Sequence, residues 1–594
     1  MTDPHQLLHS VWGFQSFRGV QEEVVGRVLG GQHTLAVMPT GAGKSLCYQL
    51  PALARSGTAL VVSPLIALMH DQIRSADALG IRAAAMTSAD DRQAVAQRAL
   101  AGELDLLYVA PERATTDSFR QLVDRVNLAL IAIDEAHCVS DWGHDFRPDY
   151  RQLRSLLDEH AEVPRLALTA TADRRTREDI LQQLGIPKDG LIVSGFDRPN
   201  IRYHVRPRDT LGKQLKTLLD AQPGPGIVYA PSRDGTERLA EQMAATGRSA
   251  LAYHAGLEPQ IRARNQSAFV ASEEMVMAAT VAFGMGIDKP DVRFVAHAGI
   301  PKSIEAYYQE TGRAGRDGEP AEAWLFWGQE DFARARRRIE SEVEPERQAG
   351  ERERLNALAA FVETATCRRA ILLRHFGEEP SASCGNCDNC LEPAATIDAT
   401  EVARKLLSAA FRTEMRFGVA HLAAVLAGND NEKVRSFGHD RLSVFGICSA
   451  EEAALLRPVA RALIARDALR ADAYGGLSFG PGARPILNGG EPVVIAVPPP
   501  RRRTRKERVA GEETADPLFA ALRAARREIA AETGVPPYVV FHDSTLREIA
   551  AARPRSLHEL SRIQGVGEAK LKRYGEQMLE AIRRHEETDH ASAA

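Results

Sequence analysis

Short apolar runs alternate with longer amphipathic stretches through the first 335 residues of the chain. The runs at 59–64 and 128–133 are apolar almost throughout, and each is followed by a loop and a helical pattern. Uninterrupted apolar runs of this kind are typical of parallel strands that are buried on both faces of a sheet. The pattern predicts one series of strands at 33–40, 59–64, 105–111, 128–137 and 165–172, and a second at 226–231, 275–284, 292–299 and 322–327.

Two series of parallel strands predict two doubly wound α/β domains, joined near residues 195–205. The pattern turns helical from about residue 338 and leads into a cluster of cysteines. A proline-rich, basic stretch without periodicity then separates a small α/β unit, with a strand pair around 468–479, from a compact helical domain. The expected units are 1–205, 206–337, 338–400, 401–496, a linker at 497–515, and 516–590.

Length and charge narrow the class of protein. A chain of 594 residues is consistent with about three to five domains. The formal net charge is only −4, so any contact with nucleic acid must come from local basic patches. The sequence contains no run of 18 apolar residues, and its first residues lack the basic and then apolar pattern of a signal peptide. We therefore expect neither a membrane span nor export.

A glycine-rich loop, MPTGAGKS, follows the first predicted strand and opens a helix. Backbone N–H groups in such a loop hold the phosphates of a nucleotide, the lysine reaches the terminal phosphates, and the serine binds Mg²⁺. Lys44 is the only lysine among the first 187 residues, which argues against a chance match. The predicted phosphate-binding residues are Thr40, Gly41, Gly43, Lys44 and Ser45.

Two acidic residues, Asp134 and Glu135, come directly after the strand LALIAI. An aspartate at the end of a parallel strand can bind Mg²⁺, and a neighbouring glutamate can polarise the attacking water. The pair lies about 90 residues after the glycine loop, so the two features together predict an ATPase site. Ser45 and Asp134 are the predicted magnesium ligands.

The second predicted domain carries two more candidate segments. Arg313 and Arg316 lie three residues apart in QETGRAGRDG, where they would share one helical face. Arginines in such a position can stabilise phosphate charge across a domain interface. The glycine-rich loop TVAFGMGIDKP contributes Gly286 and Asp288 as further nucleotide-site candidates.

Four of the seven cysteines, Cys367, Cys384, Cys387 and Cys390, lie within 24 residues. Four thiolates without a nearby competing histidine favour a closed, tetrahedral, structural zinc site. An iron–sulfur cluster and a redox-active thiol site are the alternatives. The other cysteines, Cys47, Cys138 and Cys448, are expected to be small core residues.

Taken together, GKS, DEAH, TATA, FGMGIDKP and QETGRAGRDG resemble the motifs of superfamily-two helicases. WGFQSFRGVQ, CVSDWGHDFRPDY and the position of the cysteine cluster make the chain similar, more narrowly, to the RecQ helicases. The resemblance implies two RecA-like motor domains, a zinc-binding helical module, a winged-helix domain and an all-α HRDC-like domain. It also implies ATP, Mg²⁺ and Zn²⁺ as cofactors and 3′→5′ movement on single-stranded DNA.

The same resemblance assigns further residues. Phe14 would stack on adenine, while Arg18 and Gln21 would contact adenine or phosphate. In the aromatic-rich loop at 138–150, exposed rings beside an ATP site suit base stacking and the coupling of DNA binding to hydrolysis. The predicted DNA-binding residues of this loop are Trp142, His144, Phe146 and Arg147.

The C-terminal units resemble DNA-binding modules. Residues 417–446 are similar to a winged helix, with a helix near 431–437 and a hairpin tip near 473–476 that would face duplex DNA. Residues 516–585 resemble an HRDC domain, in which the turn at 565–567 opens a helix that could hold a DNA phosphate. The predicted DNA contacts of this domain are Lys570, Lys572 and Arg573.

These features predict an ATP-dependent DNA helicase that unwinds duplex or branched DNA in recombination, replication-fork processing and repair. An RNA helicase and a non-catalytic DNA-binding or strand-annealing scaffold are the alternatives. The expected partners are single-stranded and branched DNA, a single-strand-binding protein and other repair factors, with no membrane partner. The expected location is the bacterial cytoplasm, in association with the nucleoid.

Overall fold

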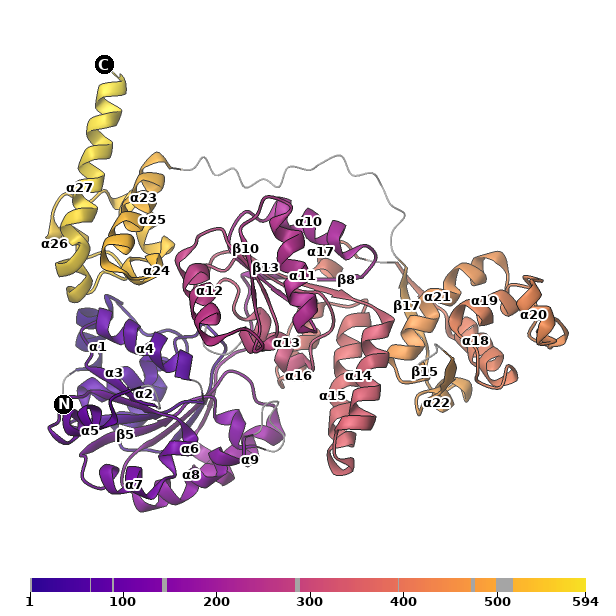
Figure 1. The fold of residues 1–594 in the computed structure, drawn as a ribbon, viewed down its shortest axis with the longest axis horizontal. Helices are drawn as coiled ribbons and strands as arrows, with labels where there is room; N and C mark the ends of the chain where they lie inside the picture. Colours follow the sequence, from indigo (N-terminus) through magenta and orange to yellow (C-terminus); the bar gives the residue numbers. More distant parts are fainter. Residues whose placement is uncertain are drawn as a thin grey trace.

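The computed structural model describes residues 3–64, 66–87, 90–140, 147–283, 289–393, 395–471, 476–497 and 516–593. Two α/β lobes lie next to each other, as Figure 1 shows in indigo and magenta. A helical module and a small mixed unit extend from the second lobe on one side. The C-terminal helical domain, in yellow, returns to lie beside both lobes.

Lobe 1 is built on a seven-stranded parallel sheet with the order β3-β4-β2-β5-β6-β1-β7. Its central strands β2 and β5 are buried almost throughout, as their apolar sequences require. The strands are β1 (Thr34–Val37), β2 (Thr58–Val62), β3 (Ala83–Met86), β4 (Leu106–Val109), β5 (Leu128–Ile133), β6 (Arg165–Thr169) and β7 (Leu191–Val193). The helices are α1 (Pro4–Leu7), α2 (Gln21–Leu29), α3 (Leu46–Ala54), α4 (Ile66–Ala78), α5 (Arg92–Leu100), α6 (Pro111–Ala114), α7 (Asp117–Val123), α8 (Pro148–Glu159) and α9 (Arg174–Leu184).

Lobe 2 is built on a six-stranded parallel sheet with the order β10-β11-β9-β12-β13-β8. Its strands are β8 (Ile201–Pro207), β9 (Gly226–Tyr229), β10 (Ala250–Tyr253), β11 (Val276–Ala279), β12 (Phe294–His297) and β13 (Ala321–Trp327). Its helices are α10 (Leu211–Ala221), α11 (Arg233–Ala244), α12 (Pro259–Ala271) and α13 (Ile304–Thr311). The predicted pair of doubly wound domains is therefore confirmed.

Four strands of the two lobe sheets were not predicted from the apolar pattern. β3 and β10 have the sequences AAAM and ALAY, whose alanines favour helix as readily as strand. β7 is only three residues long. β8 pairs with β13, so it belongs to lobe 2, and the predicted boundary at residue 205 falls inside this strand.

The helical module consists of α14 (Gln329–Glu342), α15 (Pro345–Glu363), α16 (Arg368–His375) and α17 (Asp388–Leu391). The following unit contains the predicted strand pair, as β15 (Leu469–Ala471) and β16 (Leu477–Phe479), and the helix expected near 431–437, as α20 (Glu432–Ser436). Its first strand, β14 (Ala395–Asp398), pairs with its last, β17 (Val494–Val497), so the unit begins before the predicted residue 401. Its other helices are α18 (Thr400–Arg412), α19 (Val419–Leu426), α21 (Ala450–Ala465) and α22 (Ala483–Leu487).

The C-terminal domain is all-helical, as predicted, with α23 (Pro517–Thr533), α24 (Pro537–Val540), α25 (Asp543–Ala552), α26 (Leu557–Leu560) and α27 (Glu568–Ala593). It has a hydrophobic core of its own that runs from Leu518 to Ile582. By contrast, one continuous cluster of buried side chains joins lobe 1, lobe 2 and the helical module.

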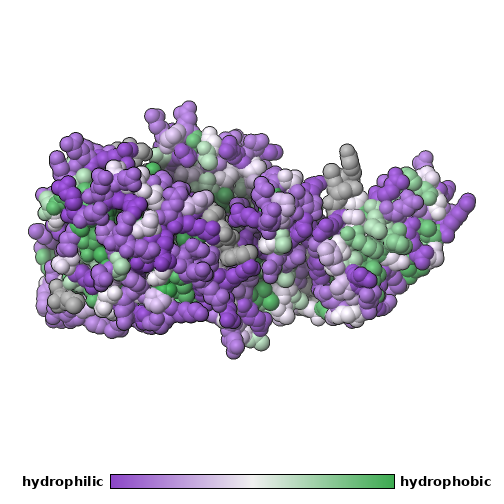
Figure 2. All heavy atoms as spheres, turned by 90° about the horizontal axis from the view of Figure 1, so that it is seen from below, coloured by the Kyte–Doolittle hydropathy of each residue, from purple (hydrophilic) through white to green (hydrophobic). Residues whose placement is uncertain are grey.

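The surface of the described residues is mostly polar (Figure 2). Apolar side chains gather on the unit at the right of this view, where Phe411 and Phe437 are 63% and 54% exposed. No helix in the described ranges is both long enough and apolar enough to span a bilayer.

Candidate active site and zinc centre

The predicted phosphate loop lies between β1 and α3, at the carboxyl end of the lobe 1 sheet. Gly41 and Gly43 have φ angles of +85° and +75°, which side chains disfavour. A Cβ on Gly43 would lie 2.4 Å from Gln21 Nε2, so a side chain there would displace Gln21 from the loop. Lys44 Nζ donates to the carbonyls of Met38 and Pro39, at 3.2 and 3.4 Å. The loop therefore holds the lysine folded over its own backbone, where a phosphate can compete for it.

The acidic pair lies at the end of β5. Burial and the neighbouring Glu135 raise the pKa of Asp134, while Lys44 opposes that shift. Lys44 and Asp134 therefore belong to one electrostatic site, as predicted from sequences about 90 residues apart. A buried carboxylate of this kind is stabilised when a cation binds, and this environment fits Mg²⁺.

Glu135 is held in the left-handed region, with φ of +49°. Its Oε2 atom is buried and accepts no hydrogen bond from the described residues, although His137 Nδ1 lies 3.3 Å away. Burial, Lys44 and Arg147 lower the pKa of His137 to about 3, so this ring is neutral. A carboxylate on a strained backbone position next to Asp134 suits a role in orienting water.

His137 connects the acidic pair to the segment after β6. Its Nδ1 atom lies 3.0 Å from Thr169 Oγ1, which donates to the carbonyl of Thr171 at 3.2 Å. The TATA sequence is thus linked to the acidic pair through one buried ring. Sequence reasoning had placed TATA only as a strand and a motif, without this contact.

The predicted base-contact residues are brought together beside the phosphate loop. Gln21 Nε2 donates to the carbonyls of Ala42 and Gly43, at 2.9 and 3.3 Å. Its Oε1 atom accepts from the backbone N–H of Arg18 at 2.9 Å. The Arg18 guanidinium lies 5.4 Å from the centre of the Phe14 ring. Gln21 therefore supports the loop from behind, which is a role that the sequence did not reveal.

The two predicted arginines of lobe 2 follow α13, and Arg316 meets the phosphate loop. A Cβ on Gly41 would lie 3.3 Å from Arg316 Cγ, so Arg316 packs directly on the loop. Arg313 is buried, and its Nε atom donates to no described acceptor. Loop and arginines lie on different lobes, as the prediction of a site across the interface requires.

Arg198 also reaches this interface, and sequence reasoning missed it. It lies between β7 and β8, and its guanidinium donates to the carbonyl of Thr40 at 2.6 Å. It also donates to three carbonyls of residues 312–316, the arginine-bearing loop that carries Arg313 and Arg316. The only sequence signal was an arginine in the proline-flanked connector GFDRPN.

Several predicted residues lie outside the described ranges: Trp142, His144, Phe146, Gly286, Asp288 and most of the hairpin tip at 473–476. Arg147 is described, and its Nη1 atom donates to the carbonyl of Pro64 at 3.1 Å. This contact fixes the end of the aromatic-rich loop against lobe 1.

The four predicted cysteines converge, with all sulfur atoms within 4.8 Å of one another. The separations of Cys384 from Cys390 and of Cys367 from Cys387 are 3.9 and 4.0 Å. Tetrahedral zinc with bonds of about 2.3 Å requires sulfurs roughly 3.8 Å apart. Burial raises the pKa of Cys390, but hydrogen bonds, led by that from Ser383 Oγ, outweigh it and hold the pKa at about 6. The cluster therefore fits Zn²⁺.

Family models match the chain along most of its length. They are the DEAD/DEAH box helicase at 18–180, the helicase conserved C-terminal domain at 210–318, RecQ zinc-binding at 329–391, the RQC domain at 393–504 and the HRDC domain at 515–582. The ATP-dependent DNA helicase RecQ of Haemophilus influenzae is 44% identical over 98% of this chain and 95% of its own. That of Bacillus subtilis is 38% identical over 97% and 98%.

The chain belongs to the RecQ family of ATP-dependent DNA helicases. The predicted family, fold class and set of cofactors are thereby confirmed, and the four cysteines form the zinc site of a RecQ zinc-binding module. The roles of individual residues in nucleotide and DNA binding stay predictions.

In this RecQ-family chain the zinc module is docked on lobe 2 by buried polar contacts. Asp388 pairs with Arg368 at 2.7 Å and with Arg206 at 3.2 Å, and it accepts from the backbone N–H of Val205 at 2.9 Å. Phe376 stacks on Phe196 with ring centres 4.7 Å apart. The zinc module therefore packs as part of the motor and is not an independent domain.

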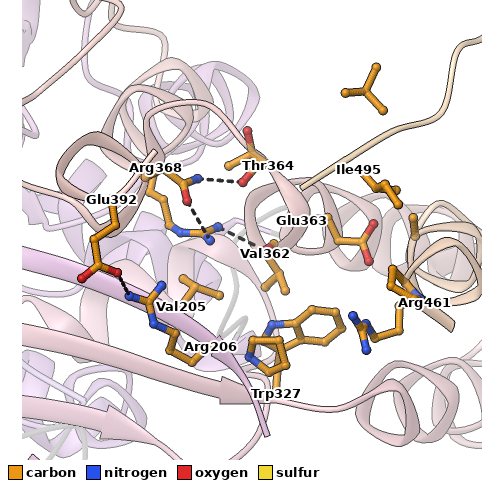
Figure 3. Close-up of a pocket in the computed structure, with 15 residues that line it drawn as sticks. Val205, Arg206, Trp327, Val362, Glu363, Thr364, Arg368, Glu392, Arg461 and Ile495 are labelled. Carbon is orange, nitrogen blue, oxygen red and sulfur yellow. Dashed lines mark hydrogen bonds and ion pairs between the residues drawn. The ribbon is translucent and has the colours of Figure 1, made fainter. Parts of the chain in front are cut away.

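A cavity of about 340 Å³ lies where lobe 2, the zinc module and the winged-helix unit meet (Figure 3). Trp327 and Val362 form part of its apolar wall, and Glu363 and Arg461 lie beside it. Burial raises the pKa of Glu363 to about 7 and lowers that of Arg461. The charged form of Glu363 is therefore unfavourable in the folded protein.

The HRDC domain contacts both lobes. On lobe 1, Gly565 N donates to the carbonyl of Gly13 at 3.0 Å, and a Cβ on Gly567 would lie 2.4 Å from the carbonyl of Val11. On lobe 2, Glu273 pairs with Arg523 at 2.6 Å and with Arg526 at 2.7 Å. The predicted phosphate-binding turn at 565–567 is thus covered by the motor in this arrangement.

The three predicted DNA contacts of the HRDC domain are placed differently from one another. Lys570 is half-buried 5.7 Å from the Phe541 ring, and burial lowers its pKa to about 8. Arg573 donates to the carbonyl of Asp77 on lobe 1 at 3.4 Å. Lys572 is exposed, and within the described ranges it makes no hydrogen bond or ion pair with the motor. The turn at 565–567 is predicted to bind phosphate because it opens a helix. The N–H groups of a helix N-terminus bind protein carbonyls and phosphates alike, so the sequence does not distinguish the two.

Proposed function

We propose that this chain hydrolyses ATP in the cleft between its two lobes and uses the cycle to move 3′→5′ along single-stranded DNA. The observation that supports this most directly is the contact between the phosphate loop of lobe 1 and the arginine-bearing loop of lobe 2. A nucleotide bound there would touch both lobes, so its hydrolysis would change how strongly they attract each other.

Each residue has a role in this proposal. Lys44 binds the terminal phosphates, and Ser45 and Asp134 hold Mg²⁺, which supplies charge neutralisation when bound. Glu135 orients the attacking water through its carboxylate. Arg313 and Arg316 stabilise the charge that develops on the transferred phosphate. Phe14, Arg18 and Gln21 hold the base side of the nucleotide.

The proposed substrates are duplex and branched DNA in recombination, replication-fork processing and repair. The aromatic-rich loop, including Trp142, His144, Phe146 and Arg147, would sense single-stranded DNA. A single-strand-binding protein and other repair factors are the proposed protein partners, because they act on the same strands. The proposed location is the bacterial cytoplasm, at the nucleoid.

The Lys44→Ala substitution tests the ATP site. It should lower DNA-stimulated ATP hydrolysis by about 10³-fold or more, because a group that meets transition-state charge is removed. Single-stranded DNA binding should survive. Lys188→Ala is the matched control, since Lys188 is exposed and lies away from the loop. Normal hydrolysis by Lys44→Ala would show that the ATP site lies elsewhere.

Strand displacement on matched DNA and RNA duplexes tests the substrate. We expect unwinding of DNA with a 3′ single-stranded tail and little unwinding of the RNA equivalent. Equal activity on both would favour the RNA-helicase alternative. DNA binding without any ATPase activity in the wild-type chain would favour the non-catalytic scaffold.

A further inference from the structure

Arg198 is the single side chain of the interlobe connector whose described hydrogen bonds reach both the phosphate loop and the arginine-bearing loop. Its Nη1 atom donates to the carbonyl of Thr40 at 2.6 Å and to that of Gly312 at 3.1 Å. Its Nη2 atom donates to the carbonyls of Ala314 and Gly315, at 3.0 and 2.9 Å. One planar guanidinium therefore joins one carbonyl of lobe 1 to three of lobe 2.

The guanidinium of Arg198 is half-buried, and its surroundings are unusual for a charged group. Among the described residues it forms no ion pair with a carboxylate, and burial lowers the pKa of Arg198. Four carbonyl dipoles replace the counter-ion. A half-buried cation held mainly by carbonyl dipoles, with Asp317 as a more distant negative charge, is stabilised further by an anion nearby. The neighbouring phosphate loop would place such an anion there.

We infer that Arg198 is a positioning residue that locks the arginine-bearing loop of lobe 2 to the phosphate loop of lobe 1, so that lobe separation follows the nucleotide state. The inference rests on the proposed function, because it takes the phosphate loop as the ATP site. Arg198 acts through Thr40 and the carbonyls around Arg313, and it need not touch the nucleotide.

The distribution of the Arg198 hydrogen bonds shows which contact breaks when the lobes separate. The two lobes are in contact here, since a Cβ on Gly312 would lie 3.2 Å from Thr40 Cβ. When the lobes part, the single bond to Thr40 breaks, while the bonds to lobe 2 can persist. A bound triphosphate beside the guanidinium favours the closed state, and loss of the terminal phosphate removes that attraction.

Asn200 provides a matched control. Its Nδ2 atom donates to the carbonyls of Gly315 and Glu319, both at 2.8 Å, so it supports the same loop but binds only lobe 2. Removing Asn200 weakens the loop without breaking a described contact between the lobes. Comparing the two positions separates a role in coupling from a role in folding.

The experiment measures base pairs unwound per ATP hydrolysed, together with kcat and KM for ATP, in the full-length chain. Arg198→Ala should raise KM and lower base pairs per ATP, each by on the order of tenfold, because a hydrogen bond from a charged group is lost. Arg198→Lys, which keeps the charge but not the planar fork, should recover part of the coupling. Asn200→Ala should leave base pairs per ATP unchanged.

Unchanged coupling in Arg198→Ala, or an equal loss in Asn200→Ala, would overturn the inference. If the alanine variant does not fold, Arg198→Lys carries the test, with zinc content and circular dichroism as folding checks. Failure of the proposed function gives a different result, namely normal hydrolysis by Lys44→Ala. The two ideas can therefore fail separately.

Discussion

The zinc module and the HRDC domain both lie against the motor lobes, but they are attached in opposite ways. The zinc module shares one cluster of buried side chains with both lobes and adds the buried pair of Asp388 with Arg368. The HRDC domain has its own core and contacts the lobes through a glycine turn and through ion pairs of Glu273 with Arg523 and Arg526.

This difference has a physical consequence. Separating the zinc module from lobe 2 would expose apolar surface and leave buried charges without their partners. Such a separation is therefore equivalent to unfolding. Parting the HRDC domain exchanges a few polar contacts for water and leaves its core intact. The first attachment is structural, and the second can be reversible.

Removing zinc should produce the largest effect. Cys387→Ala leaves three ligands, and folding of the module depends on the metal because few large apolar residues lie between Cys367 and Cys390. We expect an insoluble or protease-sensitive chain with cleavage near 380–395. Cys448→Ala is the control, since Cys448 lies outside the cluster.

Elemental analysis of the wild-type chain should give about one zinc per chain, because four thiolates form one site. Iron with visible absorbance, or a fully active protein without metal, would contradict the structural-zinc assignment.

Breaking the buried ion pair should have the next largest effect. Asp388→Ala leaves Arg368 buried without its carboxylate, so the free energy of unfolding should fall by about 3–5 kcal/mol. Glu392→Ala, which removes only the exposed partner of Arg206, should cost less than about 1 kcal/mol. Denaturant unfolding measures both, and equal losses would contradict the distinction between buried and exposed pairs.

The contrast between the two attachments could be predicted only in part. Apolar runs predicted both sheets, and spacing predicted the zinc cluster, because these signals are local in sequence. Docking of the turn at 565–567 on Gly13 was not predictable, since it depends on complementary shape between residues more than 500 positions apart. Arg198 was missed for the same reason: its partners are carbonyls, and every residue has one.

Glu363 gives a smaller, pH-dependent effect at the junction of the zinc module and the winged-helix unit. Burial raises its pKa to about 7 from a usual value near 4.5, so the folded state holds the proton more tightly than the unfolded state. Stability from this group is therefore lost as pH rises from about 4.5 to 7, and the loss is complete above that.

Glu363→Gln keeps the shape and removes the charge. It should raise the free energy of unfolding by about 1–2 kcal/mol at pH 8 and by little at pH 5. Glu353→Gln, at an exposed position of the same helix, should have no effect at either pH. Thermal unfolding at both pH values measures the difference, and a gain that is equal at pH 5 and pH 8 would rule out this cause.

Weakening the contact between the HRDC domain and lobe 2 should have the smallest effect on stability. It should clearly change the position of the HRDC domain relative to the lobes. Glu273→Ala removes the partner shared by Arg523 and Arg526, but Arg526 keeps Asp543 at 2.6 Å, so no buried charge is stranded. The loss in docking free energy should be about 1 kcal/mol and should shrink as salt screens the wild-type contact. Fluorescence energy transfer between labels on α12 and α23 measures docking directly.

Glu274→Ala, an exposed neighbour, is the control. A domain that stays docked in Glu273→Ala at high salt would show that the other contacts, including the glycine turn on Gly13 and Arg573 on Asp77, hold it without the Glu273 pairs. The attachment would then resemble that of the zinc module.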